Sequence, residues 1–220
     1  MPKIYTVEEL DDKISNETGW RKKELTTSLK LVQQSANAQN INLRSGILLL
    51  YAHWEGWVKQ IAQLYIRYVN TQSPTYEKLS AAFLGNALKT RISLIEQAST
   101  PGVHNEFASF LREGLAQKAF LSEDLVQTQS NLSSKVFLDV VERLGLPQRP
   151  EYSTRANLID EKLVDRRNTI AHGKFLALEV GDFLPLQKDV LDLLEIFTDD
   201  VRNAASTRAY LADPGWPVSR

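Results

Sequence analysis

Residues 46–68, GILLLYAHWEGWVKQIAQLYIRY, decide the fold of this chain. Their large side chains recur at alternating steps of four and three residues, which is the spacing of one face of an α-helix. The members of this stripe are Ile47, Tyr51, Trp54, Val58, Ile61, Tyr65 and Tyr68. Leu49, Trp57 and Leu64 form a second stripe beside it. Because the segment is apolar nearly all round in its middle, the pattern predicts a central helix over about 42–70.

This apolar segment is long enough to cross a bilayer, but its charges argue against that. Glu55 and Lys59 lie within it, and each charge costs about 2.5–3.5 kcal/mol at a membrane centre. The chain also begins without an apolar stretch of the kind that a secretory signal needs. The sequence therefore predicts a buried helix of a cytoplasmic protein, without a membrane partner.

Composition excludes several classes of function. The 220 residues include 26 Lys+Arg, 27 Asp+Glu and no Cys, so disulfide scaffolds, thiol catalysis and Cys-based zinc sites are excluded. A net charge of −1 excludes a strongly basic nucleic-acid coat protein but leaves room for a local basic patch. The length suits a single domain over 1–220, and the chain holds no nucleotide-binding glycine motif. No cofactor and no catalytic metal are expected.

The low content of Gly and Pro, 10 and 8 residues, together with long helical periods favours an all-α fold. Thr6-Val7-Glu8-Glu9 resembles a capping box that opens a first helix, which Gly19 is in a position to bend. Residues 74–125 are predicted to hold short helices over 75–84, 86–98 and 106–120, an inserted lobe with a break at Thr100-Pro101-Gly102. Ser130 or Asn131 is predicted to cap a helix that runs to Leu144.

The C-terminal part of the chain contains two further predicted helices. One runs from about Thr154 to His172 and ends at Gly173, and the last starts near Pro185. Between them, residues 175–184 form either a short strand or a folded loop. The tail 212–220 is predicted to be loose.

The sequence Arg166-Arg-Asn-Thr-Ile-Ala-His-Gly173 carries the chemistry. Asn168 and His172 are four residues apart and share one helix face, whereas Arg167 lies about 140° from His172 on a straight helix. A long Arg side chain and the end of the helix at Gly173 allow both to meet one ligand. A permanent cation beside a His that titrates near neutral pH suits phosphodiester chemistry. An ordinary helix end with satisfied side chains is the alternative.

The chain resembles the HEPN superfamily of α-helical domains, many of which are metal-independent endoribonucleases. Its signature is an Arg, usually followed by a polar residue, and a His after four to six intervening residues; Arg167, Asn168 and His172 match it. Residues 51–59 (YAHWEGWVK), 128–132 (TQSNL) and 167–173 (RNTIAHG) together resemble the MAE-type branch, in the same order along the chain. The resemblance implies a HEPN-like helical bundle with additional helices.

The resemblance also implies an activity and its partners. Motif helices of two protomers would face each other in a homodimer that cleaves RNA through the 2′-hydroxyl, in a bacterial toxin or defence system restrained by an antitoxin or another protein. Some HEPN toxins carry a modifiable Tyr two residues after the His, where this chain has Lys174. The alternative is a non-catalytic HEPN-type module that binds a nucleotide or a protein.

Three further residues are candidates for the surroundings of the site. Glu55 pairs either with Lys59, four residues on, or with Arg167 as a contact that orients it. His53 falls beside Leu49 and Trp57, which favours a hydrogen-bonded core histidine over a site residue. Arg166 also satisfies the spacing to His172, although Arg167 is the one that precedes Asn168.

Overall fold

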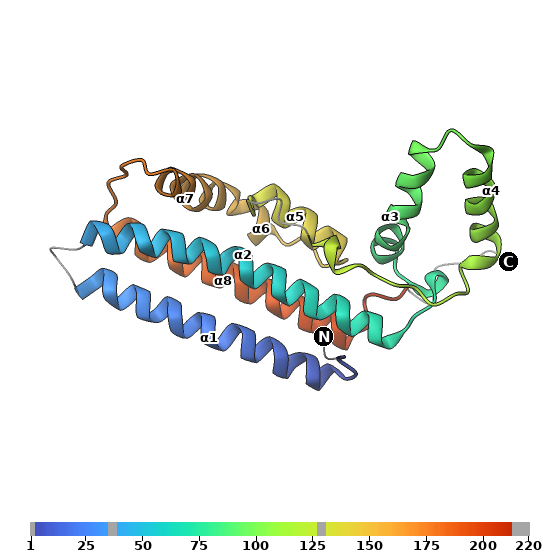
Figure 1. Cartoon of the computed structure of the whole chain (residues 1–220). Helices are drawn as coiled ribbons and strands as arrows, with labels where there is room; N and C mark the ends of the chain where they lie inside the picture. Colours follow the sequence, from blue (N-terminus) through green and yellow to red (C-terminus); the bar gives the residue numbers. More distant parts are fainter. Residues whose placement is uncertain (1–2, 35–38, 127–130, 213–220) are drawn as a thin grey trace.

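Three long helices form the body of the protein (Figure 1). The computed structural model describes residues 3–34, 39–126 and 131–212. Helices α1 (Val7–Gln34), α2 (Gln39–Gln72) and α8 (Val180–Ser206) lie side by side, and α2 contacts both of the others. The described residues contain no β-strand, only two isolated bridges. The all-α prediction is therefore confirmed.

Helix α2 is central because every member of its two stripes except Leu49 is buried. Its fully buried side chains, each at most 1% exposed, include Ile47, Leu50, Trp54, Trp57, Val58, Ile61, Tyr65 and Ile66. At its N-terminal end α8 comes so close that a Cβ on Gly46 would lie 2.9 Å from the Phe183 ring. Glycine at this position lets the two helices pack closely.

Helix α1 begins as the sequence predicts. The Glu9 backbone N–H donates to Thr6 Oγ1 (3.1 Å), and the Glu9 carboxylate accepts from the Tyr5 N–H (2.7 Å). These bonds satisfy amide groups that a helix start otherwise leaves unpaired. The helix is continuous through Gly19 to Gln34.

A second layer of short helices covers α2 and α8 on one side (Figure 1). It comprises α5 (Ser134–Arg143), α6 (Pro150–Thr154), the π-helical turn η4 (Leu158–Asp165) and α7 (Arg166–Ala171). The predicted helix over 154–172 is thus present but irregular. Its π-helical turn is joined to α5 through Asp160, whose carboxylate accepts from the Ser134 N–H and hydroxyl at 2.7 and 2.6 Å.

The prediction for the start of α5 was wrong. Ser133 caps it by accepting the Val136 N–H at 3.3 Å, whereas Asn131 lies two residues before this cap and Ser130 lies outside the described residues. The Asn131 side chain is instead bonded to Arg167. A capping residue can be chosen from the sequence only where one candidate stands alone.

Buried Asp200 of α8 fastens the second layer to the body. Its carboxylate accepts from Arg149 Nε and Nη2 at 2.6–2.8 Å and from the Tyr152 hydroxyl at 2.6 Å. Burial, then the hydrogen bond to Asp200, raises the pKa of Tyr152. Arg149 and Tyr152 flank the start of α6, so one carboxylate fixes where this helix sits on α8.

A helical hairpin projects from the C-terminal end of α2 (Figure 1). It contains α3 (Ala81–Gln97), α4 (Pro101–Ser109) and the π-helical turn η2 (Phe110–Gly114), flanked by the 3₁₀ turns η1 (Tyr76–Lys78) and η3 (Glu123–Leu125). The prediction of separate helices over 75–84 and 86–98 was wrong, since α3 runs without a break from Ala81 to Gln97 and only the turn η1 precedes it. The predicted break is present at residues 98–100, but Pro101 already opens α4, because the first helical position needs no N–H. The helix predicted over 106–120 thus begins earlier, and its last turn, η2, ends at Gly114.

The segment 175–184 is divided between two structures. Residues 174–179 have no regular secondary structure, and α8 begins at Val180, five residues before the predicted start at Pro185. The predicted loose tail falls outside the described residues from 213 onward. In the described part of the chain, no helix combines the length and apolar character that crossing a bilayer requires.

Candidate functional site

Helix α7 presents the Arg-x4-His motif on the outer layer, above α2. It follows η4 without a break, so the motif stands at the end of a continuous helical segment over 158–171. π-helical turns are rare and occur frequently at functional sites. Arg167 is half-buried and His172 is exposed, and about 7.5 Å of helix rise separates them.

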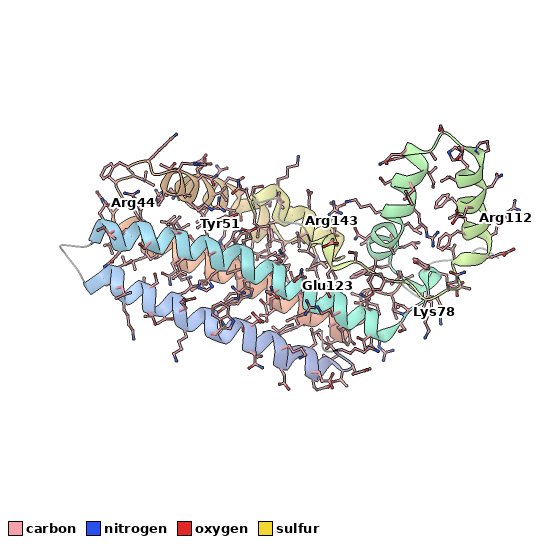
Figure 2. All side chains as sticks on the ribbon, viewed as in Figure 1. Arg44, Tyr51, Lys78, Arg112, Glu123 and Arg143 are labelled. Carbon is pink, nitrogen blue, oxygen red and sulfur yellow. The ribbon has the colours of Figure 1, made fainter. Side chains whose placement is uncertain are left out.

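Arg167 is held by three neighbours from three parts of the chain. Its Nη1 donates to Asn131 Oδ1 at 2.9 Å and to Asn168 Oδ1 at 2.7 Å. Its Cζ lies 4.1 Å from the centre of the Tyr51 ring, in a cation–π contact. Figure 2 shows Tyr51 between α2 and the layer that carries α7. These contacts fix the plane and direction of the guanidinium group.

Helix α2 also fixes the segment that brings Asn131 to this point. The Leu132 N–H donates to the Tyr51 hydroxyl at 2.9 Å, and the Leu132 carbonyl accepts from Trp54 Nε1 at 2.8 Å. Both polar groups of one fully buried backbone unit are thus satisfied by side chains of α2. Tyr51 therefore has two roles. Its ring contacts Arg167, and its hydroxyl binds the backbone of Leu132, which follows Asn131.

The environment keeps the Tyr51 phenol protonated. Burial raises the pKa of Tyr51, and the Leu132 N–H opposes that rise only in part. The Glu55 carboxylate raises the pKa further through its charge and a hydrogen bond, while Arg167 lowers it. Glu55 and Arg167 thus both act on Tyr51, which places Glu55 at the site.

His172 ends α7 and is presented to solvent. Its backbone N–H donates to the Asn168 carbonyl at 3.0 Å, which closes the last turn. Gly173 follows at φ 72°, and its N–H and that of Lys174 return to Ile170 and Thr169, the bonding pattern of a Schellman motif. The imidazole is exposed, and it forms no hydrogen bond or ion pair with the residues that the structure describes.

His53 lies on the other side of α2, against α1. Its Nε2 is 2.8 Å from Glu24 Oε2 and its Nδ1 is 3.4 Å from Arg21 Nη1, with Trp20 packed edge-on at 5.4 Å. Burial lowers the pKa of His53, Glu24 opposes this, and Arg21 adds to it. The structure therefore places His53 in the core between α1 and α2 and not beside Arg167.

The remaining candidate, Arg166, points elsewhere than Arg167. Its Nη2 lies 3.7 Å from Asp182 Oδ2 at the start of α8. Consecutive helical residues diverge by about 100°, so only one of the two can face Tyr51. The described residues contain no group of three or more His, Asp or Glu placed to hold a metal ion.

Sequence reasoning from single motifs missed two residues of the site. Tyr51 was interpreted as a core aromatic, and Asn131 as a helix cap. The signal that could have found Tyr51 is its position four residues before Glu55, on the same helix face. Asn131 stands 36 positions before Arg167 in the sequence, and no local pattern joins them.

Comparison with known protein families finds a match that covers most of the chain. The profile of the HEPN family described as HEPN_MAE_28990-like matches residues 10–210. No curated protein and no solved structure matches the chain. The matched range includes the central helix, the Asn131 segment and the Arg-x4-His helix. The chain therefore belongs to the HEPN_MAE_28990-like family of HEPN proteins.

Proposed function

We propose that this protein is a metal-independent endoribonuclease. The observation that carries the proposal is the pairing of a fixed cation with an available imidazole. Arg167 is held by Asn131, Asn168 and the Tyr51 ring, and exposed His172 ends the same helix. This pair suits a reaction that transfers protons and builds up charge on a phosphate.

The chemistry needs a proton acceptor and a proton donor. The 2′-oxygen of a ribose attacks the adjacent phosphorus while one imidazole takes up its proton. The bond from phosphorus to the 5′-oxygen then breaks, and a second imidazole gives that oxygen a proton. Arg167 stabilises the negative charge of the five-coordinate intermediate. The products are a 2′,3′-cyclic phosphate and a 5′-hydroxyl.

A homodimer would supply the second imidazole. Each chain carries only one His in the motif, and a two-fold interface presents the same surface from both protomers. Two copies of α7 facing each other would place two Arg167 and two His172 side chains around one phosphate. Light scattering should therefore detect a dimer, and a monomer with full activity would contradict this arrangement.

The test is cleavage of RNA in the presence of EDTA. Wild type should cleave RNA but not DNA of the same sequence, because DNA lacks the attacking hydroxyl. Replacement of His172 or Arg167 by Ala should abolish cleavage and leave the circular dichroism spectrum unchanged. His104→Ala on α4, which changes an exposed His far from α7, is the matched control and should remain active.

The outcomes separate the proposal from its alternatives. Activity that EDTA abolishes and magnesium restores would contradict a metal-free mechanism. Folded wild type without RNA cleavage would contradict the ribonuclease and favour a HEPN module that binds a nucleotide or a protein. End-group analysis that finds a 3′-hydroxyl in place of a cyclic phosphate would contradict attack by the 2′-oxygen.

We further infer, from the resemblance to HEPN toxins, a cytoplasmic toxin or defence effector that a partner protein restrains. Expression of wild type in bacteria should slow growth, and His172→Ala should not. Equal growth of the two strains, at equal protein levels and without the partner, would contradict a toxic role.

A further inference from the structure

Phe175 has the most exposed large apolar side chain in the part of the chain that the structure describes. It is 76% exposed, three residues after His172. Its Cα can lie at most about 11 Å from that of His172, which is the length of about three stacked bases. The exposed ring therefore lies at the same end of α7 as the proposed catalytic imidazole, within reach of the same short stretch of RNA.

The backbone immediately before Phe175 is fixed by hydrogen bonds. The Lys174 N–H donates to the Thr169 carbonyl (3.1 Å), and the Lys174 carbonyl accepts from Arg44 Nη2 (3.1 Å). Figure 2 shows Arg44 near the end of α2 that lies beside the loop after α7. Phe175 thus follows a residue whose peptide groups are bonded to both α7 and α2.

The following residues determine the direction of the Phe175 side chain. Leu176 and Leu178 are half-buried and pack against the core, whereas Phe175 and Ala177 are exposed. Burial therefore alternates from residue to residue over 175–178, and Phe175 points away from the side on which the two leucines are packed. The Phe175 side chain is thus held outward by the packing of its neighbours and is not part of the core.

The surface around this ring combines cations with apolar groups. Arg44 and the exposed Lys174 supply positive charge, and they lie close together because the Arg44 side chain donates to the Lys174 carbonyl. On α2, Ile41 and Leu48 lie one turn before and one turn after Arg44 and are 70% and 37% exposed. Aromatic and basic side chains together are the combination that binds single-stranded nucleic acid without reading its sequence.

We propose that Phe175 is a stacking platform for an unpaired RNA base close to the scissile phosphate, with Arg44 and Lys174 attracting the adjoining phosphates. The inference rests on the proposed ribonuclease function and names its substrate class as single-stranded RNA. A base in a duplex would have to leave its stack to reach the ring, which costs free energy. An unpaired base can stack on the ring directly.

Binding of a non-cleavable RNA tests the platform without the need for catalysis. The probe is a short unpaired oligoribonucleotide, fully 2′-O-methylated so that it lacks the attacking hydroxyl, and fluorescence anisotropy measures its affinity. Phe175→Ala should weaken binding about 5- to 150-fold, the range for loss of one stacking aromatic. Phe175→Trp should retain wild-type affinity. Phe120→Ala is the control, because Phe120 is 72% exposed on the hairpin side of the molecule and should not affect binding.

The platform and the ribonuclease can fail separately. Unchanged affinity of Phe175→Ala, in a protein that still cleaves RNA, would overturn the platform and leave the ribonuclease standing. Equal loss of affinity for a duplex of the same sequence would overturn the assignment to unpaired bases. If Phe175→Ala instead changed the oligomeric state and left RNA affinity intact, the ring would belong to a protein interface and the platform would be overturned. Absence of cleavage by wild type would overturn the ribonuclease itself.

Discussion

Replacing Asn131 by Ala should loosen Arg167 by a measurable amount. The substitution removes one of the two hydrogen bonds from Nη1, the 2.9 Å bond to Asn131 Oδ1, and leaves the 2.7 Å bond to Asn168 Oδ1. A hydrogen bond to a charged group contributes about 1.5–3 kcal/mol. Because Arg167 is only half-buried, water can partly replace the lost partner. We therefore expect the free energy of unfolding to fall by about 1–1.5 kcal/mol.

A double-mutant cycle isolates this contribution. Urea unfolding of wild type, Asn131→Ala, Arg167→Ala and the double variant should give a coupling free energy of about 1 kcal/mol. The single Asn131 substitution should lower the melting temperature by roughly 2–6 °C in a protein of this size. In the RNA cleavage assay it should lower kcat by about tenfold, the equivalent of 1.4 kcal/mol in transition-state stabilisation, with a smaller effect on KM.

A matched pair tests whether the coupling is specific. Asn86 is also half-buried and donates to the Arg143 carbonyl (2.7 Å) at the base of the hairpin. Asn86→Ala combined with Arg167→Ala should be additive within about 0.5 kcal/mol. Additivity of the Asn131 and Arg167 substitutions within the same limit would refute the reasoning, because the bond would then contribute nothing that water does not replace.

Three further substitutions probe other parts of the structure. Asp200→Ala should lower the free energy of unfolding by about 2–4 kcal/mol, because Arg149 and the buried Tyr152 hydroxyl lose their common acceptor; thermal melts measure this. Tyr51→Phe should cost about 1–3 kcal/mol, because it leaves the buried Leu132 N–H without an acceptor; urea unfolding measures it. His53→Gln should make unfolding less sensitive to acid. Burial lowers the pKa of His53, so the unfolded chain takes up a proton near pH 6.5 while the folded protein resists it. Wild type should therefore lose His53-linked stability as pH falls from about 7.5 to 5.5, and the variant should not.

Each of these predictions has an outcome that contradicts it. An Asp200→Ala melt equal to that of the exposed variant Asp199→Ala would show that the Arg149 network adds no stability. Tyr51→Phe as stable as wild type would mean that Leu132 finds another acceptor. His104→Gln is the control for the pH series, since His104 is exposed, and a His53 variant that matched it at every pH would contradict the lowered pKa.

The helical character of the chain and the location of its chemistry follow from the sequence alone. The two stripes of residues 46–68 require a helix that is buried nearly all round, and α2 is that helix. The spacing of Asn168 and His172 places them on one face of a helix that ends at Gly173, and α7 ends there. These features are local, since backbone periodicity and a turn residue determine them within one segment.

Tertiary structure decided which side chains meet. Asn131 reaches Arg167 because Tyr51 and Trp54 bind the intervening Leu132 backbone, a contact between segments far apart in sequence. His53 turned toward α1 because its neighbours on α2 already face the second layer. The π-helical turn η4 advances by more residues per turn than an α-helix, so a helical wheel drawn at 100° per residue cannot predict where Arg167 points. Packing sets these rotations, and packing depends on the whole chain at once.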